Sequence, residues 1–133
     1  MFDDEDPLLA RLSQMALALP GAAVKVSHGR PAFFTTKVFA YYGGSQRVDG
    51  DWVAHDHAVL VLHDEADRPG LLADPRVWVP AYLGPSGWLG VDLPARPEDL
   101  AEAGWAEVGE LLDASYRLTA PARLVAELDG RAR

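Results

Sequence analysis

Apolar residues near the start of the chain recur every three or four positions. These residues are Leu8, Leu12, Met15, Ala16 and Leu19. Such spacing places them on one face of an α-helix. Asp6-Pro7 precedes the run and suits a helix start, because aspartate caps free N–H groups and proline loses no hydrogen bond at the first helical position. The pattern predicts a helix that ends at Pro20-Gly21.

The following segment changes to the two-residue period of extended chain. Residues 22–27 alternate two valines with Lys25 and Ser27, and residues 28–42 are rich in aromatic and β-branched side chains. Gly29 and Pro31 are turn-forming residues that we place in the first bend. We therefore expect a tight hairpin over residues 28–42 and three antiparallel strands in all. Alternation then gives one face of the last strand Lys37, Phe39 and Tyr41.

Two clusters of turn-forming residues come next, at 43–46 and 49–51. They predict a loop or an irregular hairpin end over residues 43–56, and we expect it to be the most mobile internal segment. Residues 57–63 form a nearly continuous apolar run that is too short for a helix, which indicates a central strand. We expect Ala58, Leu60 and Leu62 to face the helices.

The second half of the chain predicts shorter elements. We expect a short helix at 69–73, a brief extended piece at 76–80 whose Pro80 favours a sheet edge, and a last strand at 88–93. Leu89, Val91 and Leu93 should face the helices and Trp88 the opposite side. A helical turn at 97–99, an interruption at Gly104 and a helix at 105–116 follow. A terminal helix at 121–128 should stop at Asp129-Gly130.

This order of elements indicates an α+β fold. The connections are too short for parallel crossovers, so we expect two layers, with one antiparallel sheet and helices packed on one face. The whole chain, residues 1–133, would form one domain with an acidic N-terminal tail at 1–6. The other sheet face would stay partly open and carry Lys25, His57, Val59, Val61, His63 and Trp88.

Composition limits the compartment and the chemistry. The chain has no cysteine, so disulfides, thiolate catalysis and zinc–thiolate sites are excluded. The N-terminus is acidic where a signal peptide is basic, and no apolar run approaches the roughly 20 residues of a membrane span. We expect a cytoplasmic protein that does not enter a membrane.

Charge is distributed unevenly along the chain. The net charge is −8, yet residues 7–48 contain no Asp or Glu and five cationic side chains. One interpretation is a cationic surface on an acidic body, which would attract phosphates. The alternative is a mostly buried segment that carries few charges of either sign.

Five short motifs, in order along the chain, resemble a known family. They are Leu19-Pro20-Gly21, His28-Gly29-Arg30-Pro31-Ala32-Phe33, Lys37-Val38-Phe39-Ala40, Gly87-Trp88 and Ser115-Tyr116-Arg117-Leu118 before Pro121. Together they resemble the MmcQ/YjbR family of small bacterial proteins over about residues 12 to 128. The resemblance implies a fold similar to the secretion-chaperone-like and CyaY-like sheets, and a DNA-binding role.

Two surfaces are candidates for binding. Side chains that would contact DNA are Lys25, His28, Arg30, Lys37 and Arg47. Phe33, Phe34 or Trp88 could act as their aromatic companions, and the alternative is ordinary surface charge around a hairpin. Trp88 either stacks on a ligand or packs under the 43–56 segment.

The sequence gives less support to a catalytic or cofactor site than to these binding surfaces. His55 and His57, with His63, would make an incomplete metal site, so we expect no tightly bound metal. Neither a nucleophile elbow nor a glycine-rich phosphate loop is present, so we expect no cofactor and no enzymatic activity. Two hypotheses remain: weak DNA binding by the cationic hairpin, or a protein or small ligand bound on the open sheet face around Trp88.

Overall fold

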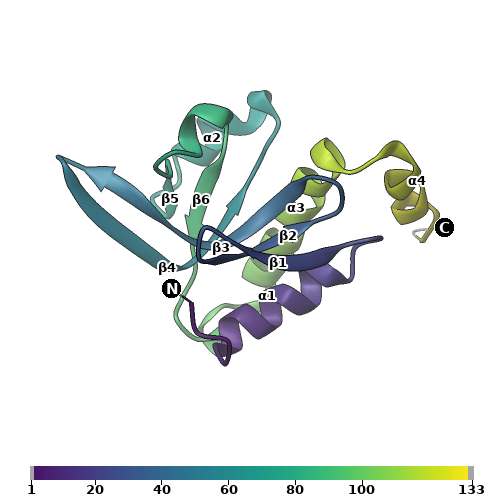
Figure 1. Cartoon of the computed structure of the whole chain (residues 1–133), viewed down its shortest axis with the longest axis horizontal. Coiled ribbons are helices and arrows are strands. Elements are labelled where there is room, and N and C mark those ends of the chain that lie inside the picture. The colour runs from purple at the N-terminus through teal and green to yellow at the C-terminus, as the bar shows by residue number, and fades with distance from the viewer. Residues whose placement is uncertain (1, 132–133) are drawn as a thin grey trace.

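A computed structural model describes residues 2–131 as one antiparallel sheet with helices against it (Figure 1). The strands are β1 (Ala23–Ser27), β2 (Arg30–Phe34), β3 (Val38–Val48), β4 (Asp51–Val61), β5 (Val77–Trp78) and β6 (Leu89–Asp92). The helices are α1 (Pro7–Leu17), α2 (Arg68–Leu72), α3 (Glu102–Thr119) and α4 (Ala122–Arg131). Short 3₁₀ turns occupy Glu65–Asp67, Gly84–Ser86 and Pro97–Asp99. The strand order is β1-β2-β3-β4-β6-β5, which confirms the α+β class and places β5 at an edge, as Pro80 indicates.

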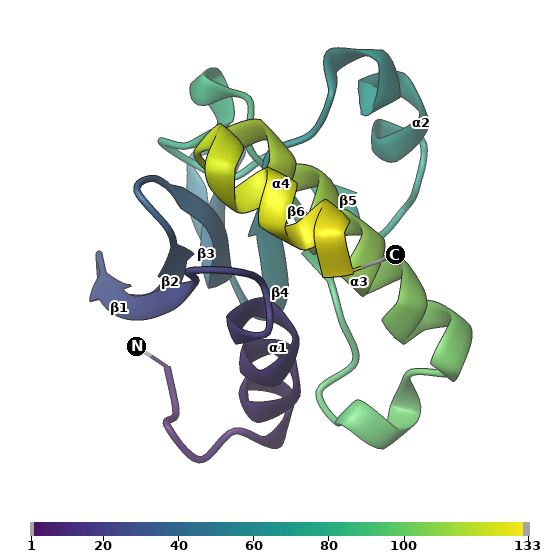
Figure 2. The ribbon, with the colours of Figure 1, turned by 90° about the vertical axis from the view of Figure 1, so that its right-hand side faces the viewer.

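Helices α1, α3 and α4 lie in front of the strands in Figure 2. The core between these layers combines Leu8 and Leu12 of α1, Val108 and Leu112 of α3, and Phe33 of β2. Burial of such side chains is the dominant favourable contribution to folding. The tail residue Met1 lies outside the described residues, while Phe2 packs partly against this core.

Helix α1 begins as its sequence predicts. The Asp6 side chain accepts a hydrogen bond of 2.9 Å from the Leu8 amide, and Pro7 is the first helical residue. Asp6 is itself buried, and its second carboxylate oxygen accepts a hydrogen bond from the Tyr42 hydroxyl of β3. The N-terminus of α1 is therefore joined to the middle of the sheet.

The hairpin around residue 30 differs from its prediction in two details. Pro31 is not in the bend, since it is the second residue of β2 and pairs with Val26. The pairing of β2 with β3 shifts between Phe33 and Phe34, which leaves Phe39 as an extra residue on β3. Because such a bulge reverses the alternation, Phe39 points into the helix-side core and Tyr41 to the other face.

The two faces of β4 are the reverse of the prediction. Val59 and Val61 pack against the helices, whereas Leu60 lies on the opposite face with Trp78 and Trp88. From Ala58 to Val61 both faces of β4 are buried, so this apolar run has no polar positions that would mark which side meets the helices. Val91 and Leu93 do face the helices, as expected.

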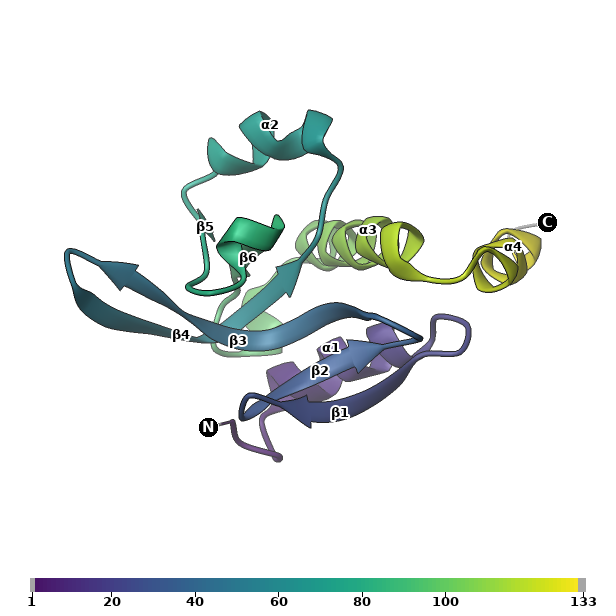
Figure 3. The same ribbon diagram turned by 45° about the horizontal axis from the view of Figure 1, so that its top comes forward.

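Residues 43–56 form a hairpin arm with a register shift at its base, so of the two predicted alternatives the irregular hairpin end is correct and the loop is not. Strands β3 and β4 pair from Gly44–His55 out to Val48–Asp51. The turn residues Asp49 and Gly50 have φ of 50° and 85°, which fits the two-residue turn that matches strand twist. Figure 3 shows the arm extending beyond the neighbouring strands. Its mobility stays a prediction.

The last two helices are longer than their sequence predicts. Gly104 lies inside α3, and the Leu100 side chain occupies the space that a Cβ at position 104 would need. Gly130 lies inside α4, which continues to Arg131. A single glycine costs a helix only about 1 kcal/mol, so it did not end either helix.

A smaller cluster covers part of the sheet face that was expected to be open. Ala58, Leu60, Trp78 and Trp88 are buried there, and Leu83 packs against them. Trp88 is 7% exposed and meets the Tyr41 ring edge-on at 5.1 Å. Trp88 is therefore packed, and its neighbours are Tyr41 and Leu83 rather than the 43–56 arm.

Candidate functional site

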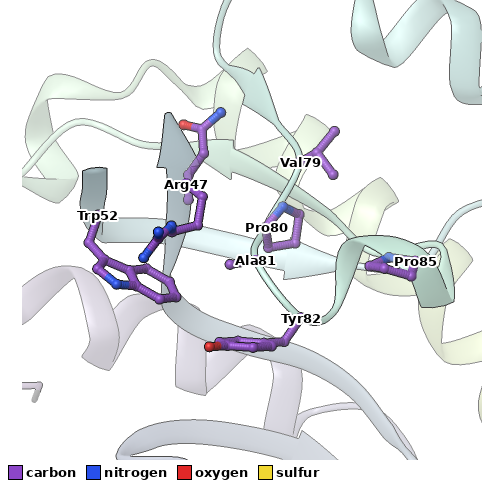
Figure 4. A pocket seen from close by; sticks show the side chains of 8 residues that line it. Arg47, Trp52, Val79, Pro80, Ala81, Tyr82 and Pro85 are labelled. Atoms are coloured by element: carbon purple, nitrogen blue, oxygen red, sulfur yellow. The ribbon is translucent and has the colours of Figure 1, made fainter. Parts of the chain in front are cut away.

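Two adjoining hollows of about 600 Å³ each lie where β3 extends past β2. Both are lined by Trp52, Pro80, Ala81 and Tyr82, so we describe them as one feature, the aromatic groove. Figure 4 shows Trp52 and Arg47 on one side of it and Tyr82 on the other. At one end the lining adds Ser27, His28, Arg30, Tyr41, Gly43, Gly44, Ser45, Leu60 and Leu83. At the other end it adds Gln46, Arg47, Val79 and Pro85.

The wall of the groove is fixed by the segment that follows β5. The Ala81 amide donates a hydrogen bond of 2.8 Å to the Ser45 carbonyl of β3, which holds this segment beside the arm. Tyr82 has a φ of 65°, a left-handed conformation that is unfavourable for a bulky side chain. Hydrogen bonds from Leu83 to Ala81 and from Gly84 to Pro80 fix the backbone around it. Strained residues of this kind cluster at functional sites.

Two aromatic side chains of the groove are exposed to solvent. Trp52 is 52% exposed and Tyr82 is 84% exposed. Their ring centroids are 5.8 Å apart, with the rings tilted by 31°. The pair offers a continuous apolar surface at the mouth of the groove.

Basic side chains reach the same groove from two hairpins. The Arg47 guanidinium lies 4.6 Å from the centre of the Trp52 ring. Arg30 lies against Gly43, where a Cβ would be 2.6 Å from its Nη1, and donates a hydrogen bond of 3.1 Å to Asp56. The pairing of β3 with β4 shifts at this point, and Gly43 lies opposite three residues of β4, 56–58. Gly43 has a φ of 79°, and Arg30 fills the space that a Cβ would need, so a glycine is required there on both counts. His28, in the β1–β2 turn, is the third basic residue of the lining.

The other residues proposed from the sequence lie elsewhere. Lys25 sits 4.8 Å above the Phe34 ring. Lys37 lies in the turn before β3, at the opposite end of β2 from Arg30. Phe33 is fully buried in the helix-side core and offers no surface to a ligand. Three of the five residues proposed to contact DNA, His28, Arg30 and Arg47, therefore line the groove.

The three histidines of the possible metal site have separate partners. His55 stacks on Trp78 at 3.8 Å and contacts Asp92 and Gln46 through its two ring nitrogens. His57 lies 3.2 Å from the Tyr42 hydroxyl, and His63 is 3.1 Å from Arg68. Within residues 2–131, no three His, Cys, Asp or Glu side chains are grouped as metal ligands.

The Tyr42 hydroxyl of β3 has a strongly raised pKa, and its burial is the main cause. Burial, followed by the hydrogen bond to Asp6, raises the pKa of the Tyr42 hydroxyl above its ordinary value. The phenol therefore stays protonated and serves as the donor that joins Asp6 to β3. This group lies in the core rather than in the groove, and its role is structural.

A comparison with models of protein families finds one that matches this chain. The family model described as YjbR matches residues 17–118, which is most of the sequence. The chain belongs to the YjbR family. The match covers β1 to β6 and nearly all of α3, so the groove of this YjbR protein lies within the family region. No curated protein matches the chain. Among residues 2–131 of the YjbR chain, no helix has both the length and the apolar character needed to cross a membrane.

Sequence reasoning did not identify Trp52 or Tyr82. Asp49-Gly50 could have predicted the arm, because this dipeptide between alternating residues favours a two-residue hairpin turn, and the arm would have placed Trp52 opposite Arg47. The position of Tyr82 depends on the long-range contact between Ala81 and Ser45, for which the sequence carries no local signal.

Proposed function

We propose that this YjbR-family protein is a non-enzymatic DNA-binding protein and that DNA lies along the aromatic groove. One observation supports this most strongly: Arg30, Arg47 and His28 come from two hairpins to the groove that also carries the exposed Trp52 and Tyr82. Arginine is well suited to phosphate contacts, and aromatic rings are suited to bases.

The composition of the groove favours binding over catalysis. Among the described residues that line it there is one histidine and no carboxylate. A general acid and base would need a pair of titratable groups within hydrogen-bond reach of each other. The lining instead supplies guanidinium groups, aromatic rings and backbone.

Binding should be weak and sensitive to salt. The body carries a net charge of −8, and the groove supplies two arginines and one histidine against it, with Arg30 already paired with Asp56. Two or three neutralised phosphates give a log–log salt slope of about −1.8 to −2.7 for a duplex, and a dissociation constant no tighter than about 10⁻⁴ to 10⁻⁶ M near physiological salt.

Fluorescence anisotropy of labelled DNA at several salt concentrations tests the proposal. Arg47→Glu should weaken binding and flatten the salt slope, because it reverses a charge inside the groove. Lys37→Glu is the matched control, since it reverses a charge in the β2–β3 turn, outside the groove. Equal losses from both variants would favour a hairpin patch over the groove, and an absence of binding at low salt would overturn the DNA proposal.

The volume of the groove favours a second candidate, a small ligand. Each hollow measures about 600 Å³, within the roughly 300 to 1,000 Å³ of small-molecule sites. Buried Leu60 and half-buried Tyr41 and Leu83 would provide apolar contacts. Thermal-shift screening against the parent and Trp52→Ala tests this candidate: a ligand that stabilises both equally does not bind in the groove.

A further inference from the structure

We infer that the aromatic groove takes unpaired DNA, with bases stacked on Trp52 and Tyr82 and phosphates held by Arg30 and Arg47. This inference rests on the proposed DNA-binding function and adds which form of DNA the groove selects. Its starting point is that the groove combines exposed aromatic rings with arginines at one place.

Trp52 differs from the other tryptophans in its exposure. It is 52% exposed, whereas Trp78, Trp88 and Trp105 are between 3% and 7% exposed. Trp52 also lies on the two-stranded arm, outside both hydrophobic clusters. Its ring contributes little to the core and is free to meet a ligand.

Tyr82 is held outward by a strained backbone. Its left-handed φ of 65° and its 84% exposure occur together beside the groove. The Trp52 and Tyr82 rings are 5.8 Å apart and tilted by 31°, so they make an open wedge rather than a closed stack. A flat base can lie against the exposed Tyr82 ring, and at Trp52 it would share the indole with the Arg47 guanidinium, which already lies over that ring.

The arginines complement this surface. Arg47 already lies over the Trp52 ring at 4.6 Å, so a phosphate next to a stacked base would be close to its guanidinium. Arg30 is anchored by Asp56 at 3.1 Å, which fixes its guanidinium at the other end of the groove. Aromatic platforms beside basic side chains are the usual means by which proteins hold single strands.

Duplex DNA would leave the aromatic surface unused. In a duplex the base faces are stacked on one another, and only base edges and backbone are accessible in the grooves. Two arginines on a body of charge −8 provide little electrostatic attraction alone. Stacking adds a contribution that only unpaired bases can supply, and it favours the single strand.

The experiment compares a labelled oligothymidine of about eight nucleotides with a duplex of the same length, by anisotropy. The single strand should bind at least about fivefold tighter, with a salt slope of about −1.4 to −2.1 for two to three phosphates. Trp52→Ala and Tyr82→Ala should each weaken single-strand binding about fivefold or more and leave duplex binding unchanged. Leu118→Ala is the control, because Leu118 is an exposed apolar residue on α3.

Iodide quenching of tryptophan fluorescence gives a second readout without mutation. Trp52 is the exposed indole, so oligothymidine should protect it from iodide. Duplex binding equal to single-strand binding, with both aromatic variants unaffected, would overturn this inference and leave the proposed function standing. Failure of the parent to bind either DNA at low salt would overturn both.

Discussion

The Tyr42 hydroxyl donates a hydrogen bond of 2.5 Å to Oδ2 of Asp6, 36 positions earlier in the chain. The other oxygen of that carboxylate, Oδ1, caps α1 through the Leu8 amide, and His57 of β4 lies 3.5 Å from Oδ2. One buried carboxylate thus joins the first helix to two central strands. This contact fixes how α1 is placed against the sheet.

Tyr42→Phe should lower the free energy of unfolding by about 1.5 to 3 kcal/mol, because it removes the hydroxyl that donates to Oδ2 of the buried Asp6 carboxylate. Urea denaturation measures the loss, and Tyr82→Phe, at an exposed site, is the control. The raised pKa of Tyr42 adds a test above pH 10, where stability from the protonated phenol is lost as pH rises. A variant with the parent's midpoint would contradict the role of this contact.

Leu60→Ala should cost about 2 to 5 kcal/mol, because Leu60 is buried against Trp78 and Trp88. The same substitution at Leu72, which is exposed on α2, should cost little and provides the control. Chemical denaturation of both variants checks the difference. Equal denaturation midpoints for the Leu60→Ala and Leu72→Ala variants would mean that this face of β4 is not packed.

Asp74 should make stability depend on acid pH. Hydrogen bonds from the Arg76 side chain and amide lower the pKa of Asp74 from 3.8 to about 2. A lowered pKa means that the carboxylate stabilises the fold above pH 4 and that this contribution is lost as pH falls toward 2. The stability gap between the parent and Asp74→Asn should therefore narrow between about pH 6 and about pH 3. Urea denaturation at both pH values measures this difference in unfolding free energy. A difference that does not change with pH would contradict the pairing of Asp74 with Arg76.

Tyr82→Gly should separate stability from binding. Glycine relieves the left-handed backbone at position 82, worth about 1 to 2 kcal/mol, while the lost ring contact with Trp52 costs about 0.5 to 1.5 kcal/mol. The free energy of unfolding should change by less than about 1 kcal/mol, and single-strand binding should still fall. Thermal unfolding and anisotropy on one preparation check both. A large loss of stability would show that Tyr82 is structural.

Much of the fold could be predicted from local patterns. The cap at Asp6, the stripe from Trp105 to Ser115 and the short edge strand at Val77–Trp78 follow from spacing and from proline. The faces of β3 and β4 could not be predicted. A bulge at Phe39 shifts the alternation, and the run around Leu60 is apolar on both sides. Which face each of these side chains occupies depends on the register of pairing with strands that are distant in the sequence.

The candidate site could be predicted only in its basic residues. Arg30, Arg47 and His28 were among the proposed set, because the charge pattern of residues 7–48 includes the two arginines and His28 lies in the hairpin turn beside Arg30. The aromatic half of the site depends on contacts between distant segments, namely Ala81 with Ser45 and Tyr82 with Trp52. Phe33 and Trp88 were proposed instead, because aromatic type alone does not distinguish a packed ring from an exposed one.

The most direct test of the groove as the DNA site is an NMR titration that follows the tryptophan indole N–H signals as single-stranded DNA is added. Trp52→Phe identifies the Trp52 signal. That signal should move with DNA concentration, while the indole of Trp105, which donates to the Pro97 carbonyl at 3.1 Å on the helix side, should stay in place. A shift of the Trp105 signal with no change at Trp52 would contradict the account and place the DNA against the helices.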